Sequence, residues 1–190
     1  MSKGRLEAFT DGVVAIIITI MVLDMKVPAG ASFAALAAGI PIFLAYALSY
    51  ANVGIFWNNH HHMLHATERV DGKVLWANLF LLFWLSLVPF VIRWIDETGF
   101  TALPIAAYGA VLAMASIGYW LLQTMIIARN GRNSQLAVAI GADLKGKLSL
   151  LAYLAAIPLA FVRPWIAISL YVAIALMWFV PDRRIERAIG

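Results

Sequence analysis

The stretch that decides the fold is residues 5–24, RLEAFTDGVVAIIITIMVLD. It begins with a basic residue, places Asp11 at the head of an apolar run and then has twelve uncharged residues before the next acid. At about 100° per residue, the side chains of Ile16, Ile20 and Leu23 fall within roughly 60° of one another on a helix. Asp11 points about 140° away from this aliphatic seam. We therefore expect a membrane helix with one aliphatic face and an acid directed into neighbouring protein.

The composition of the whole chain is that of an integral membrane protein. Of its 190 residues, 63% are hydrophobic and 13% are charged, which is more apolar surface than a water-soluble core of this size can bury. The formal net charge is +4, but the basic residues lie in short segments between apolar runs, so no nucleic-acid partner is predicted. The sequence has no cysteine, which excludes disulfides and thiolate metal sites. The predicted fold class is all-α and polytopic.

Apolar runs along the chain predict six transmembrane helices. No formal charge occurs between Lys26 and Glu68, an interval of 41 residues, whereas one span needs about 20. The second helix should therefore bend at Pro41 and continue past the bilayer boundary, and Pro89 is a possible kink in the third. The loop 129–147 should be exposed or form a short surface helix. The predicted helices are 4–27, 32–62, 73–94, 103–128, 148–162 and 165–180.

The distribution of basic residues predicts the topology. With six spans, eleven Lys and Arg residues lie on the side that holds both termini, and three lie on the other side. Because positive loops stay inside, both termini should be cytoplasmic. The last two helices are short for a span, and we favour two crossings over a hairpin that does not cross. With no internal repeat and no separate soluble segment, residues 1–190 are predicted to form one six-helix domain in the cell membrane.

Asp11 is the charge that most needs a partner. An acid near the start of a transmembrane run costs several kcal/mol unless it is paired, hydrogen-bonded or hydrated. The acid is either part of a proton or ion relay or a clamp that holds the first helix against the second. We favour the clamp, because Asp11 points away from the aliphatic seam. The candidate partners are Arg5, the hydroxyl of Thr10, and the group of Trp57, His60 and His61.

Four histidines follow the second apolar run, at positions 60, 61, 62 and 65. His61 and His65 have the i, i+4 spacing that can bind zinc, but there is only one such cluster and no acid at the right spacing. A pH-sensitive element is the second interpretation, given the pKa of histidine. Hydrogen-bonding residues at the membrane interface are the interpretation we favour. We predict no metal.

The first helix resembles a known signature. Arg5, Phe9, Thr10 and Asp11, leading into the apolar run, are similar to the pattern Arg-x-x-x-Phe-Ser-Asp of bacterial members of the transmembrane protein 175 family, relatives of the lysosomal potassium channel. The segment Trp57-x-x-His60-His61 and the six-helix length also resemble this family. Threonine stands where the family has serine, which keeps the hydroxyl and adds a methyl group.

This resemblance implies a homotetramer in which the first helix of each subunit lines a central pore. The family's narrowest hydrophobic constriction lies five residues after the motif aspartate, which is Ile16 here. Further apolar rings would lie at Ile20 and Leu23, with the Thr19 hydroxyl in the same region, and these are the residues of the aliphatic seam. The remaining motif residues would form a structural network: Arg5, Phe9, Thr10, Asp11, Trp57, His60 and His61.

The resemblance therefore predicts a potassium channel of weak to moderate selectivity rather than an enzyme. No Thr-Val-Gly-Tyr-Gly loop occurs in the sequence, so selectivity cannot come from the usual cage of backbone carbonyls. The expected partners are other copies of the chain, membrane lipid, and potassium and other monovalent cations. We expect no cofactor besides the permeating ion.

Two other functions remain open from the sequence. A proton-coupled secondary transporter would use Asp11 and the histidines at 60–65, and it predicts broken helices in paired positions. Pro41 and Pro89 do not form such a pair. A membrane enzyme would need a metal at His61 and His65.

Overall fold

The structure is a computed structural model that describes residues 2–131, 133–141 and 143–179. The described residues form helices and no strand, which agrees with the predicted all-α class. The helices are α1 (Lys3–Leu23), α2 (Phe33–Ala38), α3 (Ile40–His65), α4 (Gly72–Ser86), α5 (Val88–Thr98), α6 (Ala102–Asn130), α7 (Gln135–Ile140), α8 (Leu144–Val162) and α9 (Pro164–Phe179).

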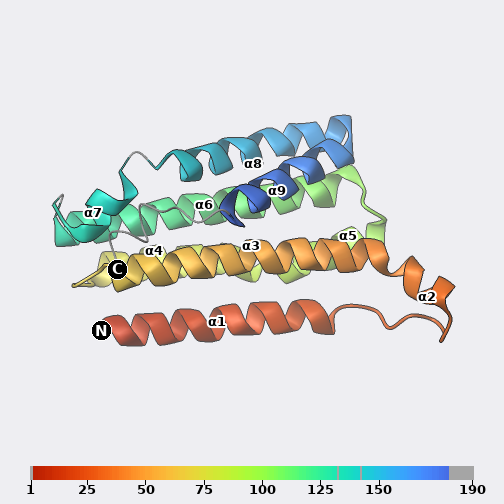
Figure 1. The fold of residues 1–190 in the computed structure, drawn as a ribbon, viewed down its shortest axis with the longest axis horizontal. Coiled ribbons are helices and arrows are strands. Elements are labelled where there is room, and N and C mark those ends of the chain that lie inside the picture. Colours follow the sequence, from red (N-terminus) through yellow and green to blue (C-terminus); the bar gives the residue numbers. More distant parts are fainter. Residues whose placement is uncertain (1, 132, 142, 180–190) are drawn as a thin grey trace.

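The long helices run side by side, and α1 lies at one edge of the bundle (Figure 1). α1 packs against α3, α4 and α5, whereas α6 packs against α4, α5, α8 and α9. Five helical segments are long and apolar enough to cross a membrane: Lys3–Leu23, Ile40–His65, Gly72–Thr98, Ala102–Asn130 and Leu144–Val162. α9 is shorter, with 16 residues, so the sixth crossing stays a prediction. The predicted end of the last helix, residue 180, lies outside the described residues.

The first helix ends at Leu23 instead of at residue 27 as predicted. Pro28 disfavours a helical conformation at the residue before it. The segment that follows α1 is instead tied to the end of α5. Lys26 Nζ lies 3.0 Å from Asp96 Oδ2, and Arg93 Nη1 lies 3.8 Å from Asp24 Oδ1. These ion pairs hold the C-terminal end of α1 beside α5.

The second predicted helix is two helices in the structure. Ser32 caps the short α2, because its hydroxyl accepts a hydrogen bond from the backbone N–H of Ala35 at 3.2 Å. The chain then breaks at Gly39 rather than bending at Pro41. Pro41 falls in the first turn of α3, where its missing N–H would have no partner in any case. α3 ends at His65, three residues later than predicted.

The third predicted helix is also interrupted. α4 ends at Ser86 and α5 begins at Val88, so the break at Leu87 lies two residues before the predicted kink at Pro89. A proline inside a helix cannot donate to the carbonyl four residues earlier, and its ring crowds that carbonyl. α5 continues to Thr98, past the predicted end at residue 94, and stops at Gly99, whose φ of 65° is left-handed.

The remaining boundaries differ by a few residues. α6 extends past both predicted ends, 103 and 128. α8 begins four residues before the predicted position 148, because the Asp143 carboxylate accepts from Gly146 N at 3.2 Å and caps it. α7 is a short helix within the loop 129–147, one of the two forms predicted for it, and Leu136 and Ala139 on this helix are buried.

Gly118 sets the close approach of α6 to α4. A Cβ atom at this position would lie 2.9 Å from Leu81 Cα, a backbone atom that cannot turn away. We expect Gly118→Ala to lower the free energy of unfolding by about 1 kcal/mol, because overpacking costs about 1–3 kcal/mol and alanine returns roughly 1 kcal/mol of helix propensity. Denaturant unfolding in detergent, followed by circular dichroism, measures this. Gly54→Ala in α3, where a Cβ meets nothing within 4 Å, is the control and should not destabilise.

Candidate functional site

α1 has one face against its own subunit and one face away from it. The buried face consists of Leu6, Thr10, Val14, Ile17 and Met21, at helical spacings of three and four residues. The aliphatic seam is on the other side. Ile16 is 58% exposed, Ile20 is 42% exposed and Leu23 is 81% exposed. The subunit's own helices thus leave the seam uncovered.

Thr19 lies beside the seam and is also exposed. Its hydroxyl donates a hydrogen bond to the backbone carbonyl of Ile16 at 3.0 Å. A threonine that bonds to its own helix in this way keeps the oxygen lone pairs of its hydroxyl outward. The exposed face therefore has branched aliphatic groups with one hydroxyl oxygen between them.

Asp11 is bound by Trp57 of α3. The indole Nε1 donates to Asp11 Oδ1 at 2.8 Å. The sequence predicted an acid directed into neighbouring protein, but Asp11 is exposed, because the buried face of α1 is centred on Thr10 and Val14. Of the candidate partners, Arg5 forms no ion pair with Asp11 in the described part of the chain, and Thr10 bonds elsewhere.

Thr10 belongs to a buried network that joins three helices. Asn78 of α4 donates from Nδ2 to Thr10 Oγ1 at 2.9 Å, and its Oδ1 lies 2.8 Å from His60 Nε2 of α3. Because an amide oxygen only accepts, the His60 ring nitrogen is the donor. The three residues are 2% exposed or less. Asn78 was not among the predicted site residues, although an amide inside the apolar run 74–92 was a signal for such a contact.

A third contact lies at the N-terminal end of α1. His61 Nδ1 lies 3.2 Å from Glu7 Oε1, and the His61 ring stacks on Trp57 with centroids 6.1 Å apart. We call the three contacts, Asp11–Trp57, Thr10–Asn78–His60 and Glu7–His61, the α1 clamp. Phe9 and Arg5, the other motif residues, are exposed and lie outside it. Together the contacts fix the N-terminal half of α1 on α3 and α4.

The histidines do not assemble a metal site in the described ranges. No group of three or more His, Asp or Glu side chains there is placed to hold a metal ion. His61 and His65 face each other edge to face, with ring centroids 6.4 Å apart. His65 instead contributes its backbone carbonyl, which accepts from Lys3 Nζ at 3.1 Å.

Comparison with known proteins identifies the family. Residues 5–89, which include the motif and the clamp, match the family model described as endosomal/lysosomal potassium channel TMEM175. A potassium channel of Chryseobacterium sp. (strain P1-3) is 50% identical over 189 residues, which is 100% of this chain and 98% of that protein. The chain belongs to the TMEM175 family. The resemblance seen in the first helix is thereby confirmed.

Other TMEM175 relatives extend this result. The endosomal/lysosomal proton channel TMEM175 of Bos taurus is 30% identical over 159 residues, covering 74% of this chain and 33% of that protein. The crystal structure of a lysosomal potassium-selective channel TMEM175 homolog from Chamaesiphon minutus has the same fold, with a TM-score of 0.77 over 99% of this chain and 98% of that one at 24% identity. This protein is thus a multi-pass membrane protein of a channel family, not of an enzyme family.

Proposed function

We propose that this chain is a potassium-conducting cation channel in which four copies of α1 surround a central pore. The observation that carries the proposal is the division of α1 into a clamped face and an uncovered aliphatic face. The names of relatives support it: the Chryseobacterium protein is called a potassium channel, and so is a Streptomyces collinus protein that is 34% identical over 128 residues, which is 63% of this chain.

The position of α1 suits assembly around an axis. It lies at the edge of the bundle (Figure 1), so the α1 helices of several subunits can meet without moving the other helices. A chain with one such helix needs further copies to enclose a pore, and closed rotational symmetry is the usual way to do so. We assign a homotetramer, in accordance with the single six-helix unit predicted for residues 1–190.

The proposed selectivity arises from partial dehydration at Ile16. Four isoleucine side chains form a hydrophobic ring that excludes water and blocks ions when narrow. A slight widening admits a cation that has lost part of its water shell, and potassium holds this shell less tightly than sodium. Ile20 and Leu23 lie about 6 and 10 Å further along the axis and lengthen the dry zone. Because no backbone carbonyl replaces the lost water, potassium selectivity should be weak to moderate.

The proposed orientation follows from the charge distribution. Both termini lie in the cytoplasm of a cell-membrane protein, although the three basic residues after residue 179 lie outside the described ranges. α9 provides the sixth crossing. It follows α8 directly through Arg163 and packs against it, so a short span with local membrane thinning suits the pair.

Two features count against the alternative of a proton-coupled transporter. His60 is buried and bonded to Asn78, which leaves it poorly placed for a relay with Asp11. Helix breaks occur at Gly39 and Leu87, but the first precedes the span Ile40–His65 and the second lies inside Gly72–Thr98. They are therefore not in the matching positions that a transporter repeat requires.

Ion flux through the purified protein tests the proposal. In liposomes loaded with potassium and diluted into potassium-free buffer, we expect potassium efflux that needs no substrate and no pH gradient. A proton ionophore supplies the compensating charge, and protein-free liposomes are the control. Efflux that requires an imposed pH gradient would instead indicate the transporter, and absence of any flux would contradict both.

A further inference from the structure

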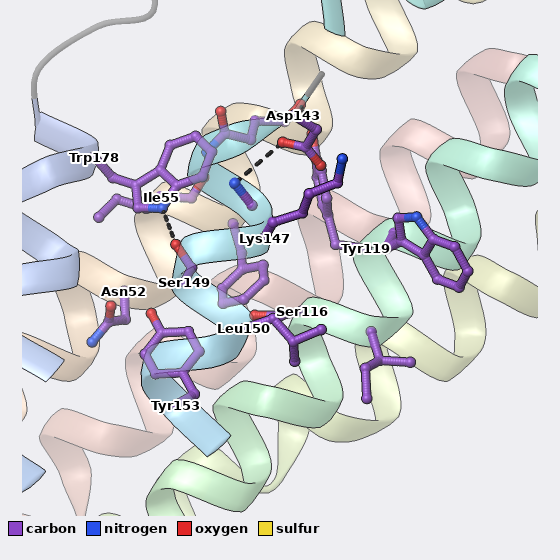
Figure 2. A pocket seen from close by; sticks show the side chains of 15 residues that line it. Asn52, Ile55, Ser116, Tyr119, Asp143, Lys147, Ser149, Leu150, Tyr153 and Trp178 are labelled. Carbon is purple, nitrogen blue, oxygen red and sulfur yellow. Dashed lines mark hydrogen bonds between the residues drawn. The ribbon is translucent and has the colours of Figure 1, made fainter. Parts of the chain in front are cut away.

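A cavity away from α1 is the second notable site of the molecule. It has a volume of about 510 Å³ and lies between α3, α6 and α8 (Figure 2). Its walls are mainly apolar, with Ile55, Phe56 and Leu150 among them. Trp178 of α9 covers one side, where its indole Nε1 donates to Ser149 Oγ at 2.9 Å. This volume is typical of a site for an organic ligand, and neither the α1 clamp nor the aliphatic seam uses it.

One end of the cavity is charged. Asp143 and Lys147 line this end (Figure 2), and Lys145 Nζ lies over the Trp178 ring, 5.6 Å from its centroid. Two ammonium groups and one carboxylate therefore lie at this rim. This is where α8 begins, at the same end of the bundle as the start of α1 (Figure 1). The candidate span Leu144–Val162 begins here, which would place the rim near the lipid headgroups.

A tyrosine hydroxyl lies deeper in the cavity. Tyr153 lines the wall and is 3% exposed, and within the described ranges its hydroxyl forms no hydrogen bond. The hydroxyl is not among the fully buried, unpaired polar atoms of the described residues, so it is accessible from the cavity. It can donate to an acceptor oxygen of a ligand, a bond that contributes about 0.5–1.5 kcal/mol. Tyr153 follows Lys147 by six residues, or about 9 Å along the helix axis. Figure 2 shows its hydroxyl directed toward the Lys147 end.

We propose that this cavity binds one anionic phospholipid per subunit. One acyl chain lies between α3, α6 and α8, the phosphate lies at Lys145 and Lys147, and an ester carbonyl accepts from the Tyr153 hydroxyl. Basic pockets between transmembrane helices are typical sites for anionic headgroups. Each part of such a lipid has a matching feature in the cavity. The basic rim matches the phosphate, the Tyr153 hydroxyl matches the ester linkage, and the apolar walls match the acyl chain.

Lipid titration of the purified protein, followed by native mass spectrometry, tests the proposal. The wild type should bind one phosphatidylglycerol per subunit in preference to phosphatidylcholine. Lys147→Gln should weaken phosphatidylglycerol binding about fivefold, since one basic residue near the surface contributes about 1 kcal/mol. It should weaken phosphatidylcholine binding less, because the choline group neutralises the charge of that headgroup. Lys73→Gln, an exposed lysine at the start of α4, is the matched control and should bind as the wild type does.

Two further variants test the interior of the cavity. Tyr153→Phe keeps the ring and removes the hydroxyl, so it should weaken both lipids by a similar factor of about five without altering headgroup preference or the unfolding curve of delipidated protein. Ser116→Phe places a ring in the cavity and should abolish binding of both lipids. The proposal is overturned if Ser116→Phe binds as the wild type does, if phosphatidylcholine binds as tightly as phosphatidylglycerol, or if Lys73→Gln and Lys147→Gln behave alike.

Discussion

The Ile16→Asn channel is expected to conduct more current and to lose its preference for potassium over sodium. An asparagine ring would be hydrated, because each amide has donors and acceptors for water, so cations could pass with their shells intact. Lowering the barrier by 1.4 kcal/mol corresponds to a tenfold rate, and we expect conductance to rise by about threefold to tenfold. Both effects have one cause, the loss of the dehydration step.

Planar-bilayer recording separates these effects. Unitary current in symmetrical potassium gives the conductance, and the reversal potential with potassium on one side and sodium on the other gives the permeability ratio. Val22→Asn makes the same chemical change on the exposed surface of α1, 48% exposed and about 120° from Ile16, and should behave as the wild type. If Ile16→Asn leaves both quantities unchanged, Ile16 is not the constriction.

Asn78→Leu is expected to give the largest loss of stability, about 2 kcal/mol. The substitution removes two buried interhelical bonds, those to Thr10 and to His60. An unpaired buried group costs about 1–3 kcal/mol in soluble proteins, but interhelical bonds in membranes average about 0.6 kcal/mol with a maximum of about 1.7. Two such bonds at about 1 kcal/mol each, between this average and this maximum, give the expected loss.

Unfolding in detergent with a denaturant gradient measures the Asn78 effect. Asn58→Leu, at an exposed position of α3, is the matched control and should change stability by less than about 0.5 kcal/mol. The double variant Asn78→Leu with Thr10→Val should lose less free energy of unfolding than the two single variants added together. Each single substitution leaves the other side chain without its hydrogen-bond partner, and the double variant removes both. Strict additivity would show that the two side chains do not act as one network.

Helical periodicity was sufficient to predict the aliphatic seam. Ile16, Ile20 and Leu23 lie on one exposed face, because spacings of three and four residues fix relative direction on any helix. Periodicity alone did not predict which face of this helix packs against the rest of the subunit. Asp11 was expected to face protein, yet it lies exposed and is reached by Trp57, since only the packing of α1 on its neighbours decides which face is buried.

The partners of these residues required the tertiary structure. Asn78 is 68 residues from Thr10 and 18 from His60, and no local pattern connects such positions. The end of the first helix was predicted incorrectly for a similar reason. The helix stops at Leu23, and ion pairs to α5 hold the segment that follows it. Proline positions did predict interruptions near 41 and 89, but the breaks fall two residues earlier, because the carbonyl that loses its partner lies N-terminal to the ring.

The two ends of α1 are fastened to different parts of the bundle. Its N-terminal half is fixed to α3 and α4 by the clamp, whereas Asp24 is tied to α5 through Arg93. The interruption at Leu87 separates α4 from α5. A tilt of α5 about this joint would swing the Leu23 end of α1 sideways while Thr10 stays anchored. In a ring of four such helices, the pore would then widen at its Leu23 end, while its diameter at the Thr10 end stays constant.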